Sequence, residues 1–481
     1  MPQPGPSFRD PMGRCYVTER GAVRLVGAGD VPQFECFLKT RAARDFAAKG
    51  QLVVTRRLDE GEIAALAASS GLGSALAARG GAAVYEHERI PFPSYPQEWP
   101  PEMLWEAGQL TLELGRAALA EGYGLKDATP HNVLFRGSKP VFVDVLSFER
   151  REAGDPLWKP CAQFIRSFLL PLLANRRWGI ALADVFTTHR DGLEPEEVYR
   201  LCRPWERLHP RLLPLVSIPT WLTRRADPDN EAIYQPRRMA NAEKARYVLE
   251  SVFDRMGRAL RWLQPAAQRE SAWSGYMEEH SYNEGAFAAK EKFVGEALAA
   301  FKPGRVLDAG ANTGHFSALA ARGGAAVVAI DSDAACVGAM WRRAQGEGLN
   351  ILPLVVNLAR PTPATGWRNR ESPSFLERAA GAFDGALMLG LLHHLLVTER
   401  IPLEEIAGLA ADLTTGLAVI EFVAPQDPMF RRLTRGRGEL HAALDERAFA
   451  EACAAHFEII KTLALPGTQR TLYWLKKKVA R

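Results

Sequence analysis

The sequence predicts an α/β protein in two parts, with a C-terminal seven-stranded, doubly wound, Rossmann-like sheet preceded by an α+β N-terminal domain. Three observations predict this architecture. Apolar strand-like runs alternate with helix-length runs from residue 305 onward. The first of these runs ends in a glycine-bearing turn, and 481 residues are many for a single hydrophobic core. We expect the two parts to be residues 1–270 and 271–481.

The C-terminal part begins with a strand, a turn and a helix that are typical of a site for a nucleoside-containing cofactor. Residues 305–317 read Arg-Val-Leu-Asp-Ala-Gly-Ala-Asn-Thr-Gly-His-Phe-Ser. Gly310 and Gly314 would let a ligand approach the backbone closely. A second apolar strand ends at Asp331, whose carboxylate can accept hydrogen bonds from two ribose hydroxyls.

The glycine spacing indicates which cofactor to expect. A dinucleotide fingerprint needs glycine at three places, and Asn312 and His315 occupy two of them. The segment instead resembles the first motif of class I S-adenosylmethionine-dependent methyltransferases, carried here by Asp308, Gly310, Asn312 and Gly314. Asn312 replaces a frequent glycine, which is tolerable because asparagine adopts left-handed conformations readily. An ordinary strand-turn-helix unit is the alternative.

The remaining elements follow the order that class I methyltransferases use, so the resemblance extends over the whole C-terminal part. We expect a helix near 333–346, strands at 351–356, 383–389 and 417–423, helices at 402–413 and 445–455, and a final antiparallel hairpin of 457–465 and 470–475.

The resemblance implies S-adenosyl-L-methionine as the cofactor and assigns residues to it. Asp308 would lie near the methionine part and help to hold its ammonium group. Asn357, at the end of the third strand, would bond the adenine edge, although the family more often has aspartate there. Neither role requires a metal, and we expect none for methyl transfer.

Candidate catalytic residues follow the fourth and fifth strands. A histidine near its ordinary pKa accepts a hydroxyl proton well, so His394 or His393 could be the base. Glu421 could be the base instead, or could orient one of the imidazoles. The alternatives are a helix cap and an interior packing role for the histidines, and a surface role for Glu421.

The acceptor is predicted less directly. Arg431, Arg432, Arg435 and Arg437 occupy what we expect to be a loop after the fifth strand, where they could form a lid over an anionic group. A solvated basic loop is the alternative. No Asp/Asn-Pro-Pro-aromatic segment or Pro-Cys pair follows the fourth strand, which disfavours methylation of adenine or glutamine amino groups and of cytosine carbon. We expect a hydroxyl or another heteroatom of a small-molecule or glycan-like acceptor.

The N-terminal part has a different pattern. Residues 14–26 predict a short hairpin, residues 60–80 are alanine-rich and helical in period, and residues 91–101 contain five prolines and should be a loop. A helix over 103–120 then leads into the second informative segment of the chain.

That segment resembles the catalytic loop of protein-kinase-like folds. Asp127 precedes Asn132 by five positions, and an apolar hairpin after Asn132 ends at Asp144. The resemblance implies that Asp127 would accept a substrate proton while Asn132 and Asp144 would hold Mg²⁺ with ATP. No Gly-x-Gly-x-x-Gly loop or Val-Ala-x-Lys strand precedes it. A bifunctional kinase-methyltransferase, a degenerate kinase-like module and a solvent-facing turn therefore all remain open, as does a non-catalytic cofactor-binding protein.

The whole chain is also similar to a group of bacterial methyltransferase-like proteins related to nodulation host-specificity proteins. The similarity rests on Pro93-Ser-Tyr-Pro-Gln-Glu-Trp99, Leu125-Lys-Asp-Ala with Asn132, Phe142-Val-Asp-Val-Leu-Ser-Phe148 and Glu421-Phe-Val. It implies the same two-part architecture and fixes no substrate.

Composition restricts the class of partner and the compartment. The chain has 60 basic and 56 acidic residues, and the resulting net charge of +4 is too small to attract nucleic acid through the overall electrostatic field. Six cysteines without a Cys-x-x-Cys pair argue against a disulfide framework, a zinc site or an iron-sulfur cluster, and fit a reducing compartment. No apolar run reaches the roughly 18 residues of a membrane span. We expect a cytoplasmic protein without a transmembrane segment, and the oligomeric state stays open.

Overall fold

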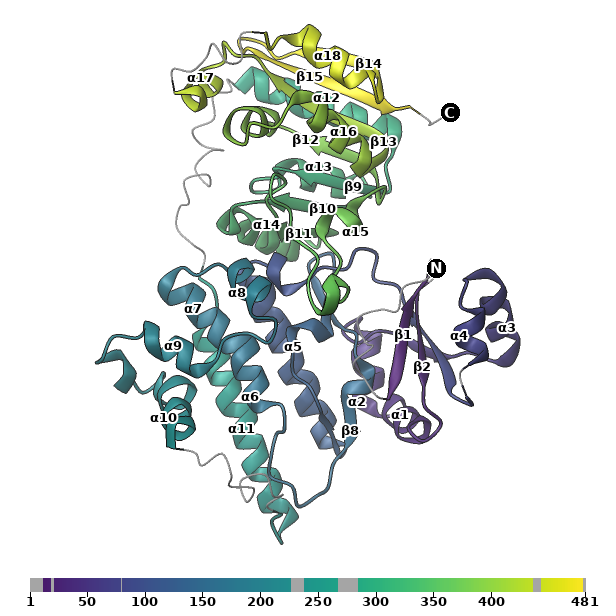
Figure 1. Cartoon of the computed structure of the whole chain (residues 1–481), viewed down its shortest axis with the longest axis vertical. Helices are drawn as coiled ribbons and strands as arrows, with labels where there is room; N and C mark the ends of the chain where they lie inside the picture. Colours follow the sequence, from purple (N-terminus) through teal and green to yellow (C-terminus); the bar gives the residue numbers. More distant parts are fainter. Residues whose placement is uncertain are drawn as a thin grey trace. The chain divides into compact units, whose positions relative to one another are not determined.

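The computed structural model describes residues 12–18, 21–78, 80–225, 238–266, 284–435 and 443–478. The chain forms two compact units (Figure 1). The N-terminal unit is Met1–Pro265 with Thr365–Ser372, and the C-terminal unit is Ala266–Ala364 with Pro373–Arg481. The boundary that the sequence predicts, between residues 270 and 271, lies outside the described residues.

The C-terminal unit contains a mixed sheet of seven strands in the order β11-β10-β9-β12-β13-β15-β14. The first five strands of that order are parallel, and β15 is antiparallel to both of its neighbours, β13 and β14. The predicted sheet with its antiparallel end hairpin is therefore confirmed. The strands are β9 Arg305–Ala309, β10 Ala326–Asp331, β11 Ile351–Val355, β12 Phe383–Met388, β13 Thr414–Val423, β14 Phe457–Ala464 and β15 Arg470–Lys477.

Helices lie on both faces of this sheet (Figure 1). Alternate strand residues such as Val327, Leu387, Val419 and Trp474 form one core with the apolar sides of α12, α13 and α14. Helix α16 packs against β12 and β13, and α18 against β14. The helices are α12 Glu284–Phe301, α13 His315–Arg322, α14 Ala334–Glu347, α15 Phe375–Ala379, α16 Leu403–Leu413, α17 Pro428–Thr434 and α18 Glu446–Ala454.

The N-terminal unit begins with a four-stranded antiparallel sheet in the order β1-β2-β4-β3. Its strands are β1 Gly13–Val17, β2 Gly21–Val26, β3 Thr55–Arg57 and β4 Ala83–Glu88, and its helices are α1 Val31–Leu38, α2 Arg41–Ala48, α3 Glu60–Ser69 and α4 Gly73–Ala77. The single helical stretch expected over 60–80 is two helices. Gly71 separates them with a φ of 68°, a left-handed conformation that ends a helix.

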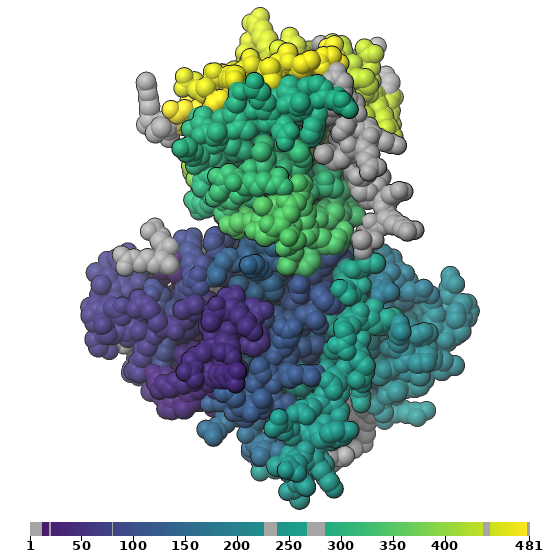
Figure 2. All heavy atoms as spheres, turned by 180° about the vertical axis from the view of Figure 1, so that it is seen from behind, coloured from purple at the N-terminus to yellow at the C-terminus, as the bar shows by residue number. Residues whose placement is uncertain are grey.

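Helix α5 is the centre of the rest of this unit, and it contacts α11, α7 and α2. It begins two residues before the predicted start, because Pro101 is acceptable in a first turn. The predicted hairpin after Asn132 is confirmed as the pair β6 and β7. In the space-filling view, α11 forms a ridge at the surface of this unit (Figure 2).

The elements of this second half are as follows: α5 Pro101–Ala120, β5 Tyr123–Leu125, β6 Val133–Arg136, β7 Lys139–Phe142, β8 Phe148–Arg150, α6 Cys161–Phe164, α7 Leu170–Trp178, α8 Leu182–Thr188, α9 Pro195–Leu201, α10 Ile218–Arg225 and α11 Ala242–Trp262. Among the helices that the structure describes, none has both the length and the apolar character needed to cross a membrane.

Candidate cofactor and acceptor site

A cavity of about 400 Å³ opens in the C-terminal unit at the carboxyl ends of four neighbouring parallel strands. Ligands of open α/β sheets bind at this edge. Its walls come from the segments that follow β9, β10, β11 and β12, and from α12 and α13. Lining residues include Lys290, Asp308, Gly310, Asn312, Phe316, Asp331, Asn357, Arg360, Gly390 and His394.

The turn after β9 adopts left-handed backbone conformations at three positions. The φ angles are 73° at Gly310, 51° at Asn312 and 80° at Gly314. A Cβ atom on Gly314 would lie 2.6 Å from Cγ of Met340, so a side chain at that position would collide with α14. Glycine is needed there for the packing of this turn as well as for its conformation.

Two backbone hydrogen bonds, one of them from the turn after β9, fix the side chain of Asp331 at the end of β10. Its Oδ2 accepts a hydrogen bond from the backbone N–H of Asn312, and its Oδ1 accepts one from that of Asp333, each at 2.9 Å. Burial raises the pKa of Asp331, and these two backbone bonds oppose the rise. Each oxygen has further acceptor capacity, so the carboxylate can still accept from a diol in the cavity.

Asp308 is nearly fully buried at the end of β9. Ser317 of α13 donates a hydrogen bond from Oγ to Oδ2 of Asp308 at 2.6 Å. Burial raises the pKa of Asp308 to about 6, against the effect of the Ser317 bond; the nearby Asp331 raises it further and Lys290 lowers it. The site therefore contains a carboxyl group whose charge changes close to neutral pH.

Asn357 follows β11 and also lines the cavity. Its Oδ1 accepts a hydrogen bond from the backbone N–H of Ala359 at 2.9 Å, which fixes the side chain in a local turn. The side-chain NH₂ is then the group that Asn357 can offer to a ligand.

The two histidines after β12 have different surroundings. His394 lines the cavity, whereas His393 is 0% exposed and is not part of the cavity wall. Burial lowers the pKa of His393 to about 3, so its imidazole is neutral, and neither ring nitrogen has a hydrogen-bond partner among the described residues. Burial also lowers the pKa of His394, and the charge of Arg470 lowers it further.

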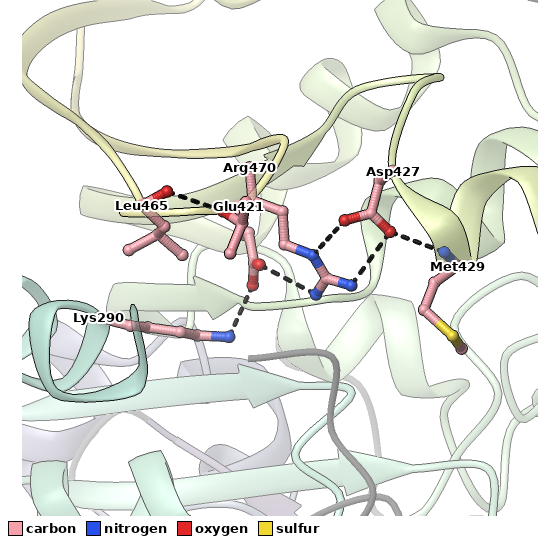
Figure 3. Close-up of polar contacts among 7 residues, drawn as sticks. Lys290, Glu421, Asp427, Met429, Leu465 and Arg470 are labelled. Atoms are coloured by element: carbon pink, nitrogen blue, oxygen red, sulfur yellow. Dashed lines mark hydrogen bonds and ion pairs between the residues drawn. The ribbon is translucent and has the colours of Figure 1, made fainter. Parts of the chain in front are cut away.

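Glu421 belongs to a buried chain of alternating charges (Figure 3). Its Oε2 lies 2.6 Å from Nζ of Lys290, and its Oε1 lies 3.4 Å from Nη1 of Arg470. Arg470 in turn binds Asp427, with 2.8 Å between Nε and Oδ2. Glu421 is fully buried rather than at the surface, and it is not among the cavity-lining residues. Of the three candidate bases, only His394 lines the cavity.

Sequence reasoning missed Lys290, Arg470, Asp427 and Ser317. Lys290 gave the clearest signal, because it lies on the apolar side of α12 at helical spacing from Ala286, Phe293, Val294 and Ala297. A lysine at such a position must be paired or must face a cavity. Arg470 gave no comparable signal, because it directly follows the turn of the predicted hairpin, where an arginine is usually exposed.

The arginine-rich segment is a helix over part of its length, where a loop was expected. Helix α17 contains Arg431 and Arg432, and Arg435 follows it. The helix forms because Asp427 accepts a hydrogen bond from the backbone N–H of Met429 at 2.8 Å, while Pro428 stands in the first turn. Helix α17 packs against the turn 394–398, which contributes His394 to the cavity. Arg437 lies outside the described residues.

In the N-terminal unit, the structure brings Asn132 and Asp144 to a common neighbour. Asn132 donates from Nδ2 to Oγ of Ser147 at 3.2 Å, and that hydroxyl donates to Oδ2 of Asp144 at 2.5 Å. Arg24 of β2 holds the other oxygen of Asp144, with 2.7 Å between Nη1 and Oδ1. Burial favours a higher pKa for Asp144, but Arg24 and Ser147 together keep it below its ordinary value. Asp127 is exposed on the preceding turn.

Comparisons with known proteins identify the kind of domain in the C-terminal part of the chain. Residues 281–455 match the family model of the methyltransferase domain. Nodulation protein NoeA from Rhizobium meliloti (strain 1021) is 28% identical over 484 residues, which cover 99% of this chain and 97% of NoeA.

Two solved structures are also similar to parts of the chain. The N-methyltransferase NodS from Bradyrhizobium japonicum WM9 is 12% identical, covers 40% of this chain and 98% of its own, and has a TM-score of 0.31. The bifunctional kinase-methyltransferase WbdD is 20% identical, covers 45% of this chain and 41% of its own, and has a TM-score of 0.29. The C-terminal sheet, the motif after β9 and the family match lead to one conclusion: the chain contains a class I methyltransferase domain, and the protein is an S-adenosylmethionine-dependent methyltransferase.

Proposed function

We propose that this protein transfers the methyl group of S-adenosylmethionine to a hydroxyl group, or another heteroatom, of a small-molecule or glycan-like acceptor that carries negative charge. The observation that carries the proposal is that one cavity is lined both by acids suited to the methyl donor and by His394, a histidine with a lowered pKa.

The order of the strands supports the assignment of the donor's parts. Asn357, Asp331 and Asp308 follow β11, β10 and β9, which are neighbours in the sheet. Adenine beside Asn357, ribose at Asp331 and the amino-acid part at Asp308 would then extend along one edge of the sheet. The left-handed turn at Gly310 and Gly314 fits this arrangement, because it keeps side chains away from the ligand-facing backbone. When bound, S-adenosylmethionine supplies a methyl group on a sulfonium sulfur.

His394 is the best-supported base. Its lowered pKa means that the imidazole is neutral at pH 7 and can accept the proton that an attacking hydroxyl loses. Glu421 is less suitable, because Lys290 and Arg470 already stabilise its charge and it lies outside the cavity wall. His393 has a pKa of about 3 and no access to the cavity wall, so we assign it no proton transfer.

One arginine in the cavity wall, and two on a helix that contacts the turn with His394, support an anionic acceptor. Arg360 lines the cavity and pairs at 3.0 Å with Glu399, which lines it too. Arg431 and Arg432 lie on α17, which packs against the turn that contains His394. Guanidinium groups bind phosphate and carboxylate through paired hydrogen bonds, so either group on the acceptor would fit.

Exchange of His394 for glutamine tests the proposal. Bacterial extracts are incubated with isotopically labelled S-adenosylmethionine, and mass spectrometry identifies the labelled product. We expect H394Q to lower kcat about 10²- to 10⁴-fold, the usual contribution of a general base, while donor binding is retained. The matched control is H456Q in the same unit, outside the cavity wall. An H394Q variant with the wild-type rate would contradict the assignment of the base.

Phosphoryl transfer in the N-terminal unit is the less supported alternative. Asp127, Asn132 and Asp144 would have to bind Mg-ATP and a substrate. Both oxygens of Asp144 already have partners, and one of those partners is the cation of Arg24, where a kinase would need a metal ion.

A further inference from the structure

Lys290 is a buried cation in the wall of the cofactor cavity. It lies in the middle of α12, is 5% exposed, and lines the cavity together with Asp308 and Phe316. Its Nζ is 5.2 Å from the centre of the Phe316 ring, in the range of a cation-π contact. Burial of a lysine is unfavourable unless the charge is compensated, so its place in this wall calls for an explanation.

Glu421 holds Lys290 in position. The distance of 2.6 Å between Nζ and Oε2 is that of a strong, charge-assisted hydrogen bond (Figure 3). Glu421 is itself restrained by Arg470, and Arg470 by Asp427. The position of the ammonium group is therefore set by α12, β13 and β15 together.

Among the charged residues in the cavity wall, Lys290 and Asp308 are a cation and an anion that are both nearly fully buried. Lys290 lowers the pKa of Asp308, as a nearby positive charge does. An amino-acid group carries an ammonium and a carboxylate on the same carbon atom, so it is complementary to such a pair. Asp331, the proposed ribose position, follows β10, and Asn357, the proposed adenine position, follows β11. Both strands lie on the side of β9 that is away from β12.

We propose that Lys290 binds the α-carboxylate of the methyl donor, opposite the ammonium group at Asp308, and that Glu421 is the positioning residue that orients Lys290. This inference deepens the proposed function and rests on S-adenosylmethionine as the donor. This role is also consistent with the burial of Glu421 outside the cavity wall, where a general base could not reach the acceptor.

A cycle of two ligands and two proteins tests the inference. Isothermal titration calorimetry compares S-adenosylmethionine with decarboxylated S-adenosylmethionine, which lacks only the carboxylate. We expect the wild-type protein to prefer the intact donor about 10- to 100-fold, the range of a charged hydrogen bond. We expect K290M to lose this preference while it binds the decarboxylated ligand within about threefold of wild type, because that ligand makes no contact with the ammonium group.

The matched control is K461M, which removes a lysine that pairs with Glu296 at the surface of the same unit, and it should keep the wild-type preference. A K290M protein that still prefers the intact donor as strongly as wild type would overturn the inference. If K290M binds neither ligand, K290R decides the matter: a retained preference supports the inference and a lost one overturns it. Failure of the wild-type protein to bind either ligand would contradict the proposed donor itself, and with it this role of Lys290.

Discussion

Asp308 shows how a single buried residue can make the candidate cofactor site sensitive to pH. Its carboxyl group is nearly inaccessible to water, and burial raises its pKa to about 6 although Ser317 donates a hydrogen bond to it. The sequence predicted Asp308 at the end of the strand, because an acid before a glycine-rich turn is visible in the motif. The sequence could not predict the pKa, since that depends on Ser317, Asp331 and Lys290 in three other elements.

We predict that binding of S-adenosylhomocysteine weakens as the pH falls below about 6. Above its pKa, Asp308 is charged and can bind the ammonium group, and below it the neutral carboxyl loses this attraction. The decrease should be at most about tenfold per pH unit, as for a single proton. Calorimetry between pH 5 and 8 measures it, and D308N should bind weakly with little dependence on pH. An identical pH profile in D308N would show that another group is responsible.

The burial of Lys290 is predictable from the apolar pattern of its helix. The apolar positions of α12 predict which side of the helix is buried, and Lys290 falls on that side. The sequence marks its partner Glu421 as a candidate base, but the pairing requires β13 and α12 to be adjacent. The residue spacing within either segment does not predict that the two segments are adjacent in the fold.

At the level of elements, the strands of the C-terminal sheet were the most predictable part. Strands that are buried on both faces have nearly continuous apolar sequences, and β11 and β12 fall within one residue of their predicted bounds. Helix α17 was not predicted because its arginines and the glycines after it are typical of a loop. Its formation depends on the cap at Asp427, whose other contacts come from the distant Arg470.

The same buried charges make a testable contribution to stability. Arg470 pairs with both Glu421 and Asp427, so R470M would leave the buried Asp427 without this cation and Glu421 with Lys290 alone. We expect R470M to lower the free energy of unfolding of the C-terminal unit by about 3 to 5 kcal/mol.

Urea denaturation of the full chain, monitored through the transition that S-adenosylhomocysteine stabilises, measures this effect. R447M is the control: Arg447 forms an exposed ion pair with Glu451 within α18, and its loss should matter by less than about 1 kcal/mol. Equal effects of the two exchanges would argue against an important role for the buried chain of charges.

At the level of the whole molecule, the chain combines a methyltransferase domain with a separate N-terminal unit. The sequence predicted the hairpin between Asn132 and Asp144, and the structure contains it. The contact of Arg24 with Asp144 could not be predicted, because the two residues are 120 positions apart, with Arg24 in β2 and Asp144 in the segment after β7. That contact matters for Mg-ATP binding, because Arg24 occupies an oxygen of Asp144 that would otherwise be available to Mg²⁺.

We predict that Mg-ATP leaves the melting temperature of the protein unchanged, whereas S-adenosylhomocysteine raises it. A ligand stabilises a protein by about 2.7 kcal/mol at 100 times its dissociation constant, which a thermal shift detects readily. With Arg24 on one oxygen of Asp144 and Ser147 on the other, we expect no such effect from the nucleotide. A magnesium-dependent shift that D144N abolishes would restore the kinase hypothesis.

The place of Arg470 has a practical consequence for anyone who wants a minimal catalytic fragment. The family match ends at residue 455, before the final hairpin, and a fragment designed from that match would stop there. Such a fragment would omit β15 and with it the guanidinium that pairs with both Glu421 and Asp427. Any shortened enzyme that is meant to bind its donor should therefore retain the chain through Lys477.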